Sequence, residues 1–140
     1  MNMKSSVSQL ETVFGPLEIR VLESLWSRTQ PVCVRDIQPD FPGVAYTTLM
    51  TTLDRLFRKG TLRREKSGRA FYYAPKASQQ QLVSQLAEST FATFLPGDSA
   101  AMRPILSMFV DTLGERDEAL LDELEALVRA RREELKDRAK

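Results

Sequence analysis

The chain has 140 residues, which is enough for one ordinary domain or for a small domain with an appendage. Hydrophobic residues make up 42% of it and charged residues 28%, as in a soluble globular protein. No apolar stretch is long enough to span a membrane, and Met1–Gln9 lacks the layout of a signal peptide. We therefore expect a cytoplasmic protein without stable membrane association.

Histidine is absent, and Cys33 is the only cysteine. An intrachain disulfide is thereby excluded, and the two commonest ligands of transition metals are missing. Ser-His-Asp and Cys-His catalysis are excluded as well, and there is no glycine-rich phosphate loop. The sequence thus predicts no metal site, no cofactor and no enzyme activity. Between Val32 and Val34, Cys33 is expected to be a small buried residue, with a reactive thiol as the alternative.

The net charge of +1 hides a division between two parts of the chain. Residues 1–76 hold 12 Lys and Arg against 7 Asp and Glu, whereas residues 77–140 hold 8 against 12. In the segment Arg55–Lys76, Glu65 is the only acid, and this local excess of cations suits a polyanion. We predict a basic domain at 1–76 and a second domain at 77–140.

In chain order, the first predicted helix is Pro16–Arg28, because proline is tolerated in a first helical turn and apolar residues follow at helical spacing. A brief strand is expected at Val32–Val34. A second helix is expected from Arg35 to about Asp40, and the run Phe41-Pro42-Gly43 ends it.

The third predicted helix runs from Ala45 or Tyr46 to Lys59 and ends at Gly60, which suits a left-handed cap. Its apolar stripe contains Leu49, Leu53, Leu56 and Phe57. The remaining positions form a small, polar and basic outer face that consists of Thr47, Thr48, Thr51, Asp54, Arg55 and Arg58.

A two-stranded hairpin is predicted from Leu62–Lys66 and Ala70–Ala74, with Ser67-Gly68 as the connection. Three helices followed by a basic hairpin are the layout of a winged helix-turn-helix. The predicted fold class is therefore mainly α with a small β-hairpin wing, followed by a C-terminal helical dimerisation region.

Three further helices are predicted at Gln79–Phe94, from Ala100 or Arg103 to Leu113, and from Asp117 to about Lys136. Beyond Phe94 too few residues remain to bury the apolar sides of these helices within one chain, so we expect a homodimer. The residues predicted to form the dimer are Leu82, Leu86, Phe91, Phe94, Leu106, Phe109, Leu121, Leu124, Leu127 and Val128.

This layout predicts binding to a double-stranded DNA operator, with the third helix in the major groove and the wing along the backbone. Threonines can exchange hydrogen bonds with bases and touch a thymine methyl group, so Thr47, Thr48 and Thr51 are the predicted base contacts. The predicted phosphate contacts, which set affinity more than specificity, are Tyr46, Arg55, Arg58, Lys59, Arg63, Arg64, Lys66 and Arg69.

The segment from Gly15 to Pro75 contains a specific combination of motifs: Leu25-Trp26, the run from Ala45 to Leu56, Arg58-Lys59-Gly60 and the run from Gly68 to Pro75. In this combination the segment resembles the penicillinase-repressor family. The resemblance implies a dimeric repressor on an inverted repeat, with the tail helices as the dimerisation region. It also suggests control by a membrane-bound sensor protease that leads to cleavage of the repressor between its two parts.

The tail departs from the family in two ways. It has no cysteine, unlike copper-responsive relatives, so release by a metal is not expected. The segment Ile105–Asp111 is only loosely similar to the family's cleaved stretch, and Met108-Phe109 stands where an Asn-Phe pair would be cut.

Two other functions fit parts of the pattern. One is a small-molecule-responsive regulator similar to the MarR family, although Ser67-Gly68-Arg69 lacks the Asp-Arg wing tip usual there. The other is a winged-helix module that binds an acidic protein and not DNA. We favour the homodimeric repressor, with its two third helices in successive major grooves about 34 Å apart on a palindromic operator.

Overall fold

The computed structural model describes residues 9–140, so the expectation that Met1–Gln9 is not a signal peptide falls almost wholly outside the described residues. The chain forms two compact units that divide between Thr90 and Phe91. Among the described residues, no helix combines the length and the apolar character that crossing a membrane requires.

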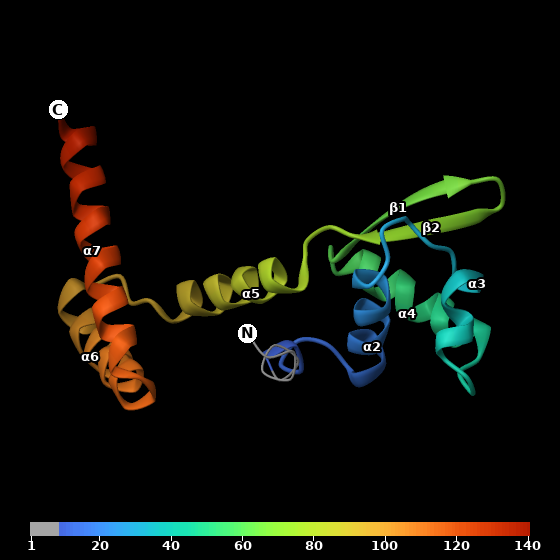
Figure 1. Cartoon of the computed structure of the whole chain (residues 1–140), viewed down its shortest axis with the longest axis horizontal. Coiled ribbons are helices and arrows are strands. Elements are labelled where there is room, and N and C mark those ends of the chain that lie inside the picture. The colour runs from blue at the N-terminus through green and yellow to red at the C-terminus, as the bar shows by residue number, and fades with distance from the viewer. Residues whose placement is uncertain (1–8) are drawn as a thin grey trace. The chain divides into compact units, whose positions relative to one another are not determined.

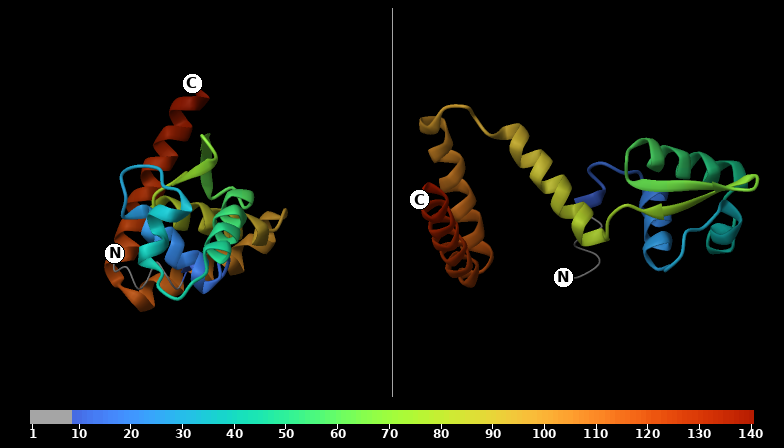
Figure 2. Two further views of the ribbon diagram at one scale, coloured as in Figure 1. Left: turned by 90° about the vertical axis from the view of Figure 1, so that its right-hand side faces the viewer. Right: turned by 90° about the horizontal axis from the view of Figure 1, so that it is seen from above.

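In the first unit the helices α2, α3 and α4 precede a hairpin, as predicted (Figure 1). The two views of Figure 2 show the hairpin running beside the third helix. The elements of this unit are α2 (Pro16–Trp26), α3 (Val34–Ile37), the 3₁₀ helix η1 (Gln38–Asp40), α4 (Tyr46–Arg58), β1 (Leu62–Ser67), β2 (Ala70–Pro75) and the first turns of α5 (Gln79–Phe94).

Helix α2 begins where the sequence predicts and ends at Trp26, two positions before the expected Arg28. Pro16 occupies the first turn, where its missing N–H is not needed. The Glu18 carboxylate accepts a hydrogen bond from the Gly15 N–H at 3.1 Å, which satisfies a free donor of the helix start.

Helix α4 ends in a Schellman motif. The Thr61 N–H donates to the Leu56 carbonyl and the Gly60 N–H to the Phe57 carbonyl, both at 3.0 Å. Gly60 has a φ of 81°, a value that L side chains adopt only at a cost. The predicted end of this helix is therefore confirmed.

The hairpin pairs β1 and β2 in antiparallel register, with Ser67 opposite Ala70. The two residues of the connection are consequently Gly68 and Arg69, one position later than the predicted Ser67-Gly68. Gly68 has a φ of 63° and Arg69 does not have a positive φ, which is the pattern of a type II′ turn with glycine first.

The predicted strand Val32–Val34 is reduced to a single bridge, in which the Val32 and Tyr73 backbones exchange hydrogen bonds at 2.9 and 2.7 Å. Helix α3 already begins at Val34, because the N–H of its cap residue Cys33 donates to the Asp36 carboxylate at 3.0 Å. Cys33 is half-buried, so the expectation of a buried side chain was wrong.

The core of the first unit is formed by apolar residues from α2, α3, α4, the two strands and α5, whereas η1 contributes no buried residue. The predicted stripe of α4 is confirmed, since Leu49, Leu53 and Leu56 are fully buried and Phe57 is half-buried. Leu82 and Val83 of α5 belong to the same core. The packing of this unit thus continues past the predicted boundary at residues 76/77, because the first turns of α5 pack against the core of the first unit.

The second unit contains α6 (Ser99–Arg116) and α7 (Glu118–Ala139), both longer than predicted. The carboxylates of Asp98 and Asp117 cap them by accepting from the N–H groups of Ala100 and Ala119, each at 3.0 Å. No residue from 91 to 140 is fully buried. The two helices therefore do not build a closed core by themselves.

Candidate nucleic-acid interface

The outer face of α4 carries the predicted base contacts on one exposed surface. Thr47, Thr48, Thr51 and Arg55 are all exposed, on the side opposite the buried leucines. They line a hollow together with Gly15–Glu18 at the start of α2. The geometry required of a groove-binding helix, namely small polar side chains free of the core, is present.

The hydroxyl groups on this helix differ in the bonds they already make. Thr51 Oγ1 donates to the Thr47 carbonyl at 2.9 Å, and Thr52 Oγ1 donates to the Thr48 carbonyl at 2.8 Å. Thr52 also lines the hollow, but it is buried, with 6% of its surface exposed. Thr51 is exposed and keeps its oxygen lone pairs available as acceptors.

The cations among the predicted phosphate contacts fall into two groups. Those of the first group are exposed and form no ion pair with any residue in 9–140; they are Arg55, Arg63, Lys66 and Arg69. By contrast, each of Arg58, Lys59 and Arg64 has an acidic partner within the chain.

Lys59 is joined to the start of α2. Its Nζ lies 2.9 Å from Glu18 Oε2 and 5.0 Å from the centre of the Phe14 ring, and it donates a long hydrogen bond of 3.4 Å to the Val13 carbonyl. These contacts hold the segment before α2 against the end of α4.

Arg64 is enclosed between two aromatic rings. Its guanidinium carbon lies 3.9 Å from the centre of the Phe57 ring and 4.2 Å from that of Phe71, and Nη1 lies 3.2 Å from Asp54 Oδ1. Arg58 Nε approaches the other oxygen, Asp54 Oδ2, to 2.9 Å. Arg64 thus connects the wing to α4 through stacking and an ion pair.

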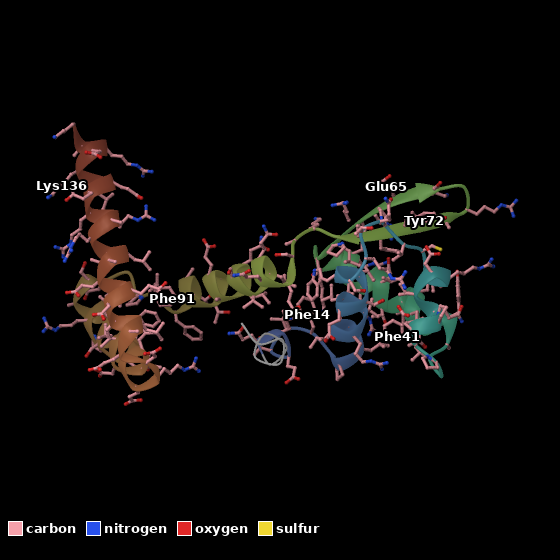
Figure 3. All side chains as sticks on the ribbon, viewed as in Figure 1. Phe14, Phe41, Glu65, Tyr72, Phe91 and Lys136 are labelled. Carbon is pink, nitrogen blue, oxygen red and sulfur yellow. The ribbon has the colours of Figure 1, made fainter. Side chains whose placement is uncertain are left out.

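Strand alternation divides the cations of β1 between the two faces of the hairpin. Arg64 and Lys66 share a face with Phe71 and Tyr73 of β2, because these residues are cross-strand partners in the observed register. Arg63 lies on the opposite face, as do Glu65 and its partner Tyr72, which are labelled in Figure 3. Not all predicted phosphate contacts therefore share one surface.

Two apolar features flank the polar face. Tyr46, a predicted phosphate contact, is exposed at the first position of α4, and Met50 is 45% exposed one turn later. Sequence reasoning missed Met50, although its spacing from Tyr46 places both on one side of the helix. It also missed the pairing of Asp54 with Arg58, for which the i, i+4 spacing was a visible signal.

The predicted dimerisation residues occupy different environments. Leu82 is in the core of the first unit and Leu86 packs against that core. In the second unit, the Phe91 and Phe109 rings have their centres 6.4 Å apart, and Leu121 and Leu124 are half-buried. The exposed members of the set are Phe91, Phe94, Leu106, Phe109, Leu127 and Val128.

The predicted cleavage pair, Met108-Phe109, lies within α6 and is exposed. Peptide bonds within a helix are protected while the helix is intact, so cutting here requires α6 to open. Pro104 lies earlier in the same helix and removes one of its backbone hydrogen bonds.

Comparison with known proteins agrees with the sequence-based resemblance. The family model described as "Penicillinase repressor" matches residues 14–130. The "Transcriptional regulator BlaI" of Mycobacterium tuberculosis, from strain CDC 1551 / Oshkosh and from strain ATCC 25618 / H37Rv, is in each case 36% identical over 122 residues, which cover 85% of this chain and 83% of the relative.

A likeness to a solved structure is weaker. The crystal structure of a MepR mutant from a multidrug resistant S. aureus clinical isolate aligns with 90% of this chain and 86% of its own, with a TM-score of 0.47 and 16% sequence identity. A likeness of this extent supports no conclusion. The family model and the BlaI relatives both match most of the chain, and the chain therefore belongs to the penicillinase-repressor family of transcriptional regulators.

Proposed function

We propose that the chain represses transcription as a homodimer whose two α4 helices read a palindromic operator. The observation that carries this proposal is the exposed row of Thr47, Thr48, Thr51 and Arg55 on one side of α4. Threonine side chains at the start of a recognition helix can meet base edges, while an arginine further along neutralises a phosphate.

The wing supplies further cations for the DNA backbone. Lys66 and Arg69 are exposed near the hairpin tip, and neither forms an ion pair with any residue in 9–140. Cations at such a position contact phosphates irrespective of sequence. Together with Arg55 they form the phosphate-binding set that we propose, and Tyr46 adds a hydroxyl group at the start of α4.

The direct test is binding of the full-length protein to duplex DNA as a function of salt concentration. A duplex selected from a random pool by the protein should bind more tightly than the same bases in scrambled order, and log Kd should rise linearly with log salt concentration. Equal affinity for both duplexes would contradict sequence-specific recognition. Binding to an acidic protein with no affinity for either duplex would favour a protein-interaction module.

The exposed apolar surface of the second unit supports a dimer. Leu120, Leu121 and Leu124 are half-buried on one stripe of α7, and the stripe continues as Val128 and Leu135, which are exposed. A unit of this size without a buried residue is not expected to be stable alone. A second copy of the chain presents the same surface, so two-fold pairing would cover both.

Sedimentation of two lysine variants tests the dimer. Val128→Lys places a charge on the apolar stripe, whereas Ala126→Lys places the same charge on the opposite side of α7. Val128→Lys should yield monomers and weaken operator binding strongly, since two linked heads bind far more tightly than one. Ala126→Lys should behave as the wild type, and monomeric wild-type protein would refute the proposal.

Induction by a membrane-bound sensor protease is the further part of this proposal. Met108-Phe109 is the segment we propose to be cut, after α6 opens locally. Incubation with the activated protease should cut the chain within α6 and give two fragments. Operator binding should then weaken, because the fragment with α4 no longer dimerises. Intact repressor after this treatment would refute the proposed cleavage but not the proposed DNA binding.

A further inference from the structure

One acidic side chain lies on the outer face of α4, the face that the proposed function directs toward a DNA groove. Asp54 is on α4, three positions after Thr51 and one before Arg55, and it is partly exposed. The other acid between Phe41 and Lys76 is Glu65, which lies on the opposite face of β1 from Arg64. A carboxylate at the Asp54 position repels phosphates and needs an explanation.

The Asp54 carboxylate is fixed in place by Arg64. The Arg64 side chain is only 26% exposed, and the stacked Phe57 and Phe71 rings restrict its guanidinium group. The two aromatic contacts hold the guanidinium group beside Asp54. The negative charge of Asp54 therefore stays on the groove-facing side of α4 when DNA approaches.

The same carboxylate holds Arg58. Arg58 is 77% exposed and would be free to contact a phosphate, but its Nε pairs with Asp54 Oδ2 at 2.9 Å. An i, i+4 pair of this kind at a surface favours the paired form about twofold. That is enough to lower the availability of Arg58, although not to prevent its release when a close complex forms.

We propose that Asp54 is a specificity-determining residue that weakens binding to DNA without the operator sequence. Binding to such DNA depends almost wholly on phosphate contacts, so a fixed negative charge and a withheld arginine reduce it. On the operator, base contacts bring α4 deep into the groove, where an aspartate can accept a hydrogen bond from a base amino group. This inference rests on the proposed function, because it requires α4 to face DNA.

The test compares Asp54→Asn with Glu65→Gln in the full-length protein. Both variants remove one negative charge, but only the first releases Arg58. Affinity for the scrambled duplex and for the selected duplex is measured over a range of salt concentrations. Asp54→Asn should bind the scrambled duplex several-fold more tightly, with a salt slope steeper by about one. Its preference for the selected duplex should fall, whereas Glu65→Gln should change both affinities slightly and equally.

Two further variants assign the effect to Arg58. The double variant Asp54→Asn/Arg58→Gln should not show the steeper salt slope on the scrambled duplex that Asp54→Asn alone shows. Arg58→Gln alone should alter the slope for the scrambled duplex little, whereas Arg55→Gln should reduce it by about 0.9. The Arg58→Gln comparison does not require the Asp54 variant to fold.

Three results would overturn the proposal. They are equal gains in Asp54→Asn and Glu65→Gln, an unchanged or reduced affinity of Asp54→Asn for the scrambled duplex, and an equal loss of slope in Arg58→Gln and Arg55→Gln. If the wild type binds neither duplex with a salt-dependent affinity, the proposed function itself fails.

Discussion

Lys59 Nζ lies 2.9 Å from Glu18 Oε2, so the cation that ends α4 is joined to the carboxylate that caps α2. The Glu18 carboxylate also accepts from the Gly15 N–H. This arrangement gives Lys59 a role in holding two helices together, in addition to the phosphate contact predicted from its position in the basic segment.

Lys59→Gln is expected to reduce stability without changing the salt dependence of DNA binding. The pair is partly exposed, so the loss in the free energy of unfolding should be below about 1 kcal/mol. A double-mutant cycle with Glu18→Gln, measured by urea unfolding, should show a coupling of about 0.5 kcal/mol. A slope of log Kd against log salt that falls by about 0.9 would instead assign Lys59 to a phosphate.

Thr51 is expected to act as a hydrogen-bond acceptor toward a base. Its hydroxyl proton is already donated to the Thr47 carbonyl, so the base group that meets it should be an amine, on adenine or cytosine. Thr51→Val keeps the shape of the side chain and should reduce operator affinity by about 1 kcal/mol or more, with little effect on the scrambled duplex.

Thr52→Val is the matched control, because Thr52 makes the same i, i−4 hydrogen bond but is buried. It should change stability and leave discrimination between the duplexes intact. Operator adenines are replaced one at a time by purine, and cytosines by 2-pyrimidinone, both of which lack the amino group. One of these replacements should weaken binding of the wild type and not of Thr51→Val. If no adenine or cytosine amine shows this behaviour, Thr51 donates or does not contact a base.

Features that depend only on residues close together in the sequence were predictable from it. The start of α2 at Pro16 and the end of α4 just before Gly60 follow from local backbone preferences, and both are confirmed. The hairpin was predicted, but its connection was placed one residue early, because Gly68 suits either central position of a tight turn. Only the pairing of the strands with the core decides between the two registers.

Contacts between distant residues were not predictable in this way. Lys59 and Arg64 belong to one basic segment in the sequence, yet Lys59 meets Glu18, and Arg64 is enclosed by Phe57 and Phe71. Net charge indicates a preference for polyanions but does not tell which cations are already paired. Leu82 was likewise assigned to the dimer from helical spacing, whereas the fold uses it in the core of the first unit.

The wing connection should be sensitive to a side chain at Gly68. Its φ of 63° is a conformation that costs an alanine about 1–2 kcal/mol, so Gly68→Ala should lower the Tm and weaken DNA binding through the displaced tip. Gly68→Asn should cost less, because asparagine tolerates this region better.

Gly97→Ala provides the control for the Gly68 variants. Gly97 does not have a positive φ, and no atom lies within 4 Å of an added Cβ. Reduced freedom of the unfolded chain should make this variant neutral or more stable by up to about 1 kcal/mol. Equal effects of alanine at both glycines would show that the turn conformation of Gly68 does not matter for stability.

The first unit should lose stability in acid through two carboxylates near α3. The Arg28 guanidinium, which donates to Asp40 Oδ2 at 2.8 Å, is the main cause that lowers the pKa of Asp40 below its ordinary value, and the Ser24 hydroxyl adds to it. The Cys33 backbone N–H is the main cause that lowers the pKa of Asp36.

Because both pKa values are lower in the folded state than in the unfolded chain, the charged forms stabilise the fold above about pH 4 and this contribution is lost as the pH falls through the folded pKa values. Asp36→Asn and Asp40→Asn should therefore lower stability at pH 7 and converge with the wild type in strong acid. The free energy of unfolding at each pH is measured by denaturant unfolding, followed by the fluorescence of Trp26, the only tryptophan. Trp26 is a suitable reporter because its Nε1 donates to the Ala77 carbonyl at 2.9 Å. Glu65→Gln on the wing is the control, and a loss of stability in the aspartate variants that does not depend on pH would refute the role of these charges.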